Sequence, residues 1–140
     1  MPSESFGSAQ DKRFPPDDPR EWLNRARSNL AKAQSTSGIP EVYLEDLCFD
    51  AQQAAEKAIK AVLIHLGARF PYVHDLAQLL ALVEQAGQSV SESIRRAASL
   101  SDYAVETRYP GLSEPVTWQE YEEAVAIAVE VVRWAQGVIE

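Results

Sequence analysis

Residues 47–66 read LCFDAQQAAEKAIKAVLIHL. Apolar side chains recur in this run every three or four residues, which is the spacing of one face of an α-helix. Several of them are alanines, whose small side chains allow a neighbouring helix to approach closely. The run therefore predicts a long helix packed at the centre of a bundle, with an apolar stripe made of Leu47, Ala51, Ala54, Ala55, Ala58, Val62 and Leu66.

The rest of the chain repeats the helical spacing, and no segment alternates apolar and polar residues for long enough to predict a strand. The sequence therefore predicts an all-α fold, an antiparallel helical bundle of about five helices, two of them long. The expected helices run from Asp17 or Asp18 to Ser35, from just after Gly38 to Leu66, from His74 or Asp75 to Gln85, from Ser89 to about Ala104, and from Thr117 to Val138.

Local signals mark where these helices are expected to begin. Asp18 precedes Pro19, and this order suits an N-cap followed by the first helical residue. Pro40 is expected to stand at the first position of the long second helix. The capping box, in which two side chains satisfy each other's backbone donors, fits the sequence at Ser89 with Glu92 and again at Thr117 with Glu120.

A chain of 140 residues is expected to form one domain. Residues 1–17 lack periodicity and contain three prolines, so we expect a flexible N-terminal arm whose end is held to the body by Phe14. The helical domain is expected to span residues 18–140.

The composition limits the classes of function. A net charge of −8 disfavours non-specific binding to nucleic acid, which depends on lysine and arginine at the phosphates. Cys48 is the only cysteine, so no disulfide within the chain is expected and a reducing cytoplasm is the simplest location. No apolar run predicts a membrane span, and no leader peptide is predicted. Two histidines without paired cysteines do not predict a metal site, and no cofactor is predicted.

His74 is one of two places where chemistry is expected. It directly precedes Asp75 at a helix start, where a capping role explains it well. Arg69 stands five residues earlier, and an arginine that binds a phosphate together with a histidine that moves a proton would suit RNA cleavage. Pro71 interrupts this pair, so the sequence favours the structural interpretation. The polar side of the long helix, which includes Glu56 and Lys60 at the favourable i, i+4 spacing, is explained without a ligand.

The other place is the segment 101–111, which reads SDYAVETRYPG. It follows one helical pattern and precedes another, and polar and aromatic groups at such ends often bind ligands. The candidate nucleotide-binding residues are Arg108, Tyr109, Tyr103 and Asp102.

Three parts of the sequence resemble HEPN domains (higher eukaryote and prokaryote nucleotide-binding). They are the run from Cys48 to Leu63, the triplet His74-Asp75-Leu76 with Leu79 and Leu80 after it, and Tyr103 followed by Thr107-Arg108-Tyr109-Pro110. The resemblance extends from about Arg20 to Glu140. It implies an antiparallel helical bundle that is often a homodimer and is often paired with a small nucleotidyltransferase-fold protein, in pairs that resemble toxin–antitoxin modules.

The resemblance also implies an RNA-cleaving motif in many members, Arg-x4–6-His, which acts without a metal. Arg108 matches its arginine, but Ser113, Glu114 and Pro115 stand where the histidine would be. Serine has no proton affinity near neutral pH and cannot act as the base. We therefore expect a nucleotide- or partner-binding module without cleavage activity. The alternatives are a ribonuclease toxin that uses Arg108 with His74, and a helical protein that only dimerises.

Overall fold

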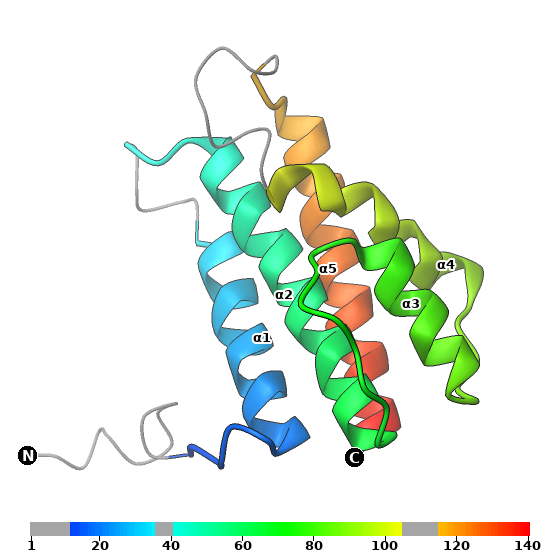
Figure 1. Cartoon of the computed structure of the whole chain (residues 1–140). Coiled ribbons are helices and arrows are strands. Elements are labelled where there is room, and N and C mark those ends of the chain that lie inside the picture. Colours follow the sequence, from blue (N-terminus) through cyan, green and yellow to red (C-terminus); the bar gives the residue numbers. More distant parts are fainter. Residues whose placement is uncertain (1–11, 36–40, 105–114) are drawn as a thin grey trace, which may run out of the picture.

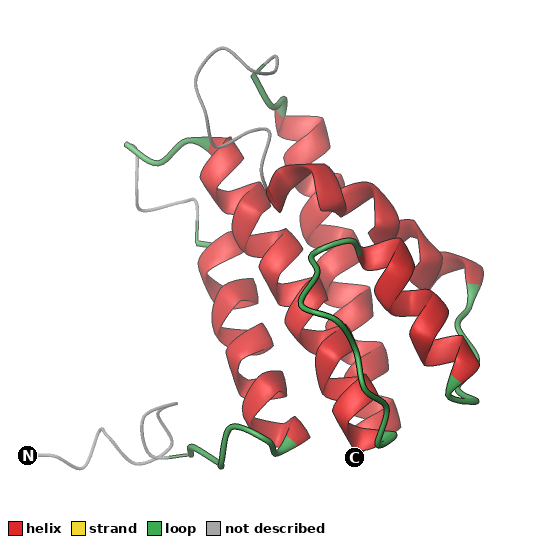
Figure 2. Ribbon diagram, in the orientation of Figure 1, coloured by secondary structure: helices red, strands yellow, loops and turns green. Residues whose placement is uncertain are grey.

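The computed structural model describes residues 12–35, 41–104 and 115–140. These residues form helices and no strand (Figure 2). The all-α bundle with two long helices is therefore confirmed. The elements are α1 (Pro19–Ala33), α2 (Leu44–His65), α3 (Leu76–Gln85), α4 (Glu92–Arg95), the 3-10 helix η3 (Arg96–Ala104) and α5 (Trp118–Ile139).

Helix α2 lies at the centre of the bundle, in contact with α1 on one side, α5 behind it, and α3 and η3 on the other side (Figure 1). The alanines of its predicted stripe have no exposed surface, which confirms that neighbouring helices pack directly against them. Helices α2 and α5 each have 22 residues and are the two long helices that the sequence predicts. Among the described residues, no helix has the length and apolar character that crossing a membrane requires.

Two of the predicted helix starts are confirmed in detail. The side chain of Asp18 accepts a hydrogen bond from the backbone N–H of Arg20 at 2.8 Å, with Pro19 as the first helical residue. At the start of α5, the Thr117 hydroxyl accepts from Glu120 N at 3.1 Å, and the Glu120 carboxylate accepts from Thr117 N at 2.8 Å. Both ends depend only on local sequence.

Two other predicted starts are wrong. Helix α2 begins at Leu44 rather than at Pro40, with Tyr43 in an extended conformation as its N-cap. This start places acidic residues in the first turn, where the helix dipole favours them. Helix α4 begins after Ser91, whose hydroxyl accepts from Ile94 N, so the pattern at Ser89 does not form a capping box.

The segment between α2 and α3, residues 66–75, crosses the surface of α2 to reach the start of α3 (Figure 1). We call it the α2–α3 loop. The chain leaves the helix at Gly67, whose φ of +72° is the left-handed conformation that favours glycine. This loop carries Phe70, Tyr72 and His74 over the lower half of α2 and so positions the site described next.

Candidate functional site

Three polar side chains of α2 are buried beneath the α2–α3 loop. Gln52, Glu56 and Lys60 retain 0%, 3% and 4% of their surface exposed. The sequence pattern places them on the polar side of the helix, and the structure corrects this: they face the loop, not solvent. Charged residues are rarely buried unless they are paired.

The Glu56 carboxylate is the centre of this cluster. It accepts hydrogen bonds from Lys60 Nζ at 2.9 Å and from Gln52 Nε2 at 2.8 Å, both one helical turn away. His74 Nδ1 lies 3.0 Å from both carboxylate oxygens. We call these four residues the Glu56 cluster. It joins the end of the α2–α3 loop to the middle of α2.

The pKa of Glu56 follows from these contacts. Burial raises the pKa, but the hydrogen bonds from Lys60, Gln52 and His74 together outweigh burial, so the pKa lies below its ordinary value. Glu56 is therefore a carboxylate at neutral pH, held in place by three donors.

His74 is the member of the cluster that reaches solvent, with 54% of its side chain exposed. In the neutral tautomer that carries its hydrogen on Nδ1, the ring donates to Glu56 and Nε2 is its acceptor nitrogen. A carboxylate that fixes a histidine in this way is the arrangement found behind many catalytic histidines. Tyr72, 93% exposed, stands edge-on to the His74 ring with centroids 6.2 Å apart. No hydrogen bond or ion pair joins Arg69 to His74 in the described structure.

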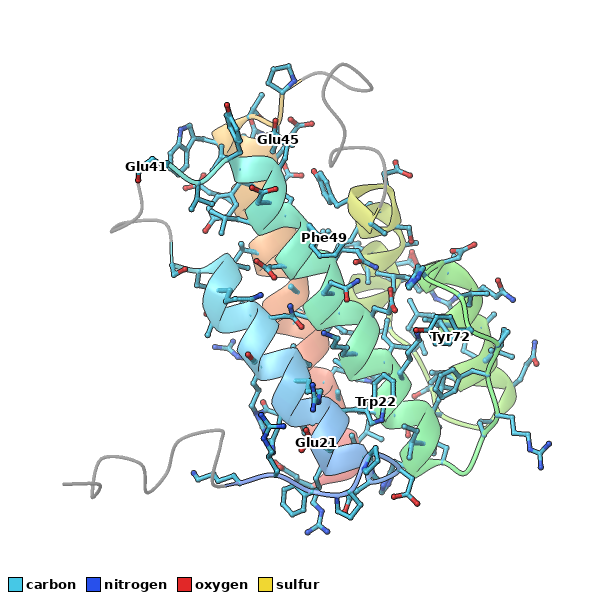
Figure 3. All side chains as sticks on the ribbon, turned by 60° about the vertical axis from the view of Figure 1, so that its left-hand side comes forward. Glu21, Trp22, Glu41, Glu45, Phe49 and Tyr72 are labelled. Atoms are coloured by element: carbon cyan, nitrogen blue, oxygen red, sulfur yellow. The ribbon has the colours of Figure 1, made fainter. Side chains whose placement is uncertain are left out.

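Aromatic rings of the loop cover the buried ammonium of Lys60. Its Nζ lies 5.7 Å from the centre of the Phe70 ring and 5.5 Å from that of Tyr72, within cation–π range. Phe70 in turn packs edge-on against Trp22 of α1, at 6.5 Å between centroids. These contacts connect Trp22 of α1 to the loop, where the Lys60 ammonium lies within reach of both Phe70 and Tyr72. Figure 3 shows Trp22 and Tyr72 on the same side of the molecule.

The predicted nucleotide-binding residues are divided by the limits of the described chain. Arg108 and Tyr109 lie outside the described residues. Asp102 is exposed at the end of η3, and Tyr103 is partly buried beside Cys48. The backbone N–H of Leu76 donates to Ser101 Oγ at 3.0 Å, so the end of η3 is held against the start of α3, close in sequence to His74.

The surroundings of Tyr103 are acidic. Glu120 and Glu123 of α5 line a small cavity with it. Burial, then the neighbouring Cys48 and Glu120, raises the pKa of Tyr103 to about 12. Cys48 is buried, and burial raises the pKa of its thiol to about 12. A phosphate is disfavoured next to these carboxylates.

The sequence does not predict the Glu56 cluster, because the i, i+4 spacing of Glu56 and Lys60 indicates an ordinary surface pair. One signal was present: both lie in a helix with apolar residues on either side of them, Ala55 and Ala58 among others. A charged pair inside such an apolar run is a candidate for burial.

The fold and the cluster define a class, an all-α bundle with a buried polar pair under the loop after its central helix. The family model described as "HEPN domain" matches residues 19–138, so the chain belongs to the HEPN domain family, as the sequence resemblance predicts. The chain is similar to the crystal structure of ST0689, an archaeal HEPN homologue. The TM-score is 0.70 and the sequence identity 26%, over 88% of this chain and 98% of that one. No curated protein matches the chain.

Proposed function

We propose that the protein is a nucleotide-binding HEPN module that works with a nucleotidyltransferase-fold partner, in a pair resembling a toxin–antitoxin system, and does not itself cleave RNA. Membership of the HEPN family supports a nucleotide-related role. The absence of a histidine five to seven residues after Arg108 argues against the usual cleavage motif.

The observation that carries the proposal is the contact between η3 and α3. The 3.0 Å hydrogen bond from Leu76 N to Ser101 Oγ brings the end of η3 to the corner where His74 is exposed. Arg108 and Tyr109 follow η3 in sequence. We propose that Arg108 binds the nucleotide phosphate and Tyr109 contacts the base, with Tyr103 and Asp102 at the base or ribose, because the carboxylates beside Tyr103 repel a phosphate.

Exposed aromatic residues support an association with a partner protein or with a second copy of the chain. Tyr43 and Trp118 are 73% and 62% exposed, at the starts of α2 and α5, which lie at the same end of the bundle (Figure 1). Large exposed apolar side chains are common where proteins associate. We propose that the chain forms a homodimer and that this end of the bundle contacts the nucleotidyltransferase-fold partner.

Binding of ATP and a short RNA to the wild-type protein and to Arg108→Ala tests the proposal. Loss of one charge-assisted hydrogen bond to a phosphate is expected to weaken binding roughly tenfold or more. Arg133→Ala, which removes an exposed arginine from α5, is the matched control and is expected to bind as the wild type does. Equal binding by wild type and Arg108→Ala would remove Arg108 from the site. If neither protein bound ATP or RNA, the result would favour the alternative of a helical protein that only dimerises.

A second candidate, a metal-independent ribonuclease, is favoured by the geometry of His74. Glu56 holds the Nδ1 edge of its ring and the side chain is 54% exposed, so His74 would move the proton while Arg108 binds the phosphate. Under this candidate, purified protein cuts RNA in the presence of EDTA. His74→Asn keeps a donor for Glu56 but cannot act as a base, so cutting is expected to fall by a factor of about 100 or more. Cutting that persists in both His74→Asn and Arg108→Ala would come from another site or a contaminant.

A further inference from the structure

A cleft of about 490 Å³ lies between the end of the N-terminal arm, α1 and α2. Its apolar walls are Phe14, Pro16 and Trp22, and Figure 3 shows Trp22 and Glu21 at the lower end of α1. The volume is within the range of sites that hold small organic ligands.

The described end of the arm, residues 12–17, is fixed against α1 by several contacts. Asn24 Nδ2 donates to Lys12 O and Trp22 Nε1 donates to Pro16 O, each at 2.8 Å. The backbone N–H of Phe14 donates to Glu21 at 3.0 Å, and the Arg20 guanidinium lies 4.1 Å from the centre of the Phe14 ring. The walls of the cleft are therefore formed before any ligand enters, which lowers the entropic cost of binding.

The charged lining of the cleft is basic, although the chain as a whole is acidic. Arg13, Arg25 and Lys57 line it, against one carboxylate, Glu21. That carboxylate already accepts from Phe14 N and from Arg25 Nε, the latter at 2.8 Å. The lining thus carries an excess of positive charge, and its single carboxylate is engaged within the protein.

The pKa of Lys57 reflects this environment. Partial burial and the positive charge of Arg25 lower the pKa of Lys57, and together with Lys32 they outweigh the carboxylates of Glu56 and Asp50, which raise it. Its Nζ donates one hydrogen bond, to Asn29 Oδ1 at 2.7 Å, and an ammonium has three donors. A bound anion would relieve the repulsion between Lys57 and Arg25.

We propose that this cleft binds a nucleoside monophosphate, with its phosphate between Arg25 and Lys57 and its base against Trp22. A basic groove with an aromatic wall is the combination that binds phosphate and base together. The inference rests on the proposed function for the kind of ligand, a nucleotide, and differs from it in the residues that bind the ligand.

Titration with AMP, adenosine and ribose 5-phosphate tests the cleft, with binding measured by calorimetry. AMP is expected to bind more tightly than either part. Lys57→Met and Arg25→Gln are each expected to weaken AMP binding roughly tenfold or more, because each removes a charged donor to the phosphate. Arg133→Gln removes the same charge elsewhere and is expected to leave binding unchanged. Thermal unfolding of each variant checks the fold, since Lys57 also bonds Asn29.

Tryptophan fluorescence adds a readout specific to the cleft. AMP is expected to change the emission of the wild type and of Trp118→Phe but not of Trp22→Phe. The reason is that Trp22 is the only tryptophan among the described residues that line the cleft. AMP binding that is normal in Lys57→Met and Arg25→Gln but lost in Arg108→Ala would overturn the cleft and keep the proposed function. AMP binding lost in the cleft variants but normal in Arg108→Ala would support the cleft and remove Arg108 from the site. Ribose 5-phosphate binding as tightly as AMP, or no AMP binding by the wild type, would overturn the inference.

Discussion

Replacing Glu56 with alanine is expected to lower the free energy of unfolding by about 3–5 kcal/mol, the usual cost of breaking a buried ion pair. The variant leaves the ammonium of Lys60 buried, with 4% of the residue exposed, and without its 2.9 Å carboxylate partner. It also removes the carboxylate that holds His74 and therefore the end of the α2–α3 loop. Urea denaturation followed by circular dichroism measures the change.

Two further variants show whether the cost comes from the unpaired charge. The double variant Glu56→Leu with Lys60→Met replaces the pair by apolar side chains and is expected to be more stable than Glu56→Ala. Glu84→Ala, on the exposed surface of α3, removes a carboxylate that pairs with Arg95 and is expected to change stability by less than about 1 kcal/mol. A double variant as unstable as the single one would show that the loop contact, and not the charge, dominates.

The pH dependence of the stability that Glu56 contributes has a definite sign. The folded-state pKa of Glu56 is lowered, so its charged form contributes stability that is fully present above the ordinary glutamate pKa, about 4.3. That contribution disappears as the pH falls through the lower pKa of the folded state. The stability difference between the wild type and Glu56→Gln is therefore expected to be largest near neutral pH and to narrow on acidification. A difference that stays constant down to low pH would mean that Glu56 is not charged in the folded protein.

The sequence predicts this fold well because most of its information is local. The period of apolar residues fixes α2 and α5, and Asp18 and Thr117 fix helix starts within one turn. The start of α2 is predicted wrongly for a related reason: Pro40 is compatible with a first turn but does not require one. The cap at Ser91 rather than Ser89 shows the same limit, since both serines precede the helix and spacing alone does not choose between them.

The candidate site is less predictable because it forms between distant segments. The sequence singles out His74, but its partner Glu56 stands 18 positions earlier in the chain, where the sequence predicts only a surface pair. Only the path of the α2–α3 loop across α2 turns that surface pair into a buried one. The cleft under the arm depends likewise on contacts such as that of Trp22 with Pro16, which no helical periodicity encodes.

Replacing Leu79 with alanine is expected to lower the free energy of unfolding by about 2–5 kcal/mol. Leu79 has no exposed surface, and it belongs to α3, which contacts α2 and η3. Removing its branched end leaves a cavity that the backbone of three packed helices closes only in part. Chemical denaturation measures the loss, and faster hydrogen exchange is expected in α3, because this short helix depends on its buried face.

The neighbouring residue provides the control. Gln78 lies exposed on the same helix, so Gln78→Ala is expected to stay within about 0.5 kcal/mol of the wild type. The comparison also bears on function, since Asp75 caps α3 and His74 directly precedes it. If α3 positions His74, the Leu79→Ala variant loses the Glu56–His74 contact along with stability, and the imidazole resonances of His74 shift. Unchanged resonances in a destabilised Leu79→Ala protein would show that the loop holds His74 without support from α3.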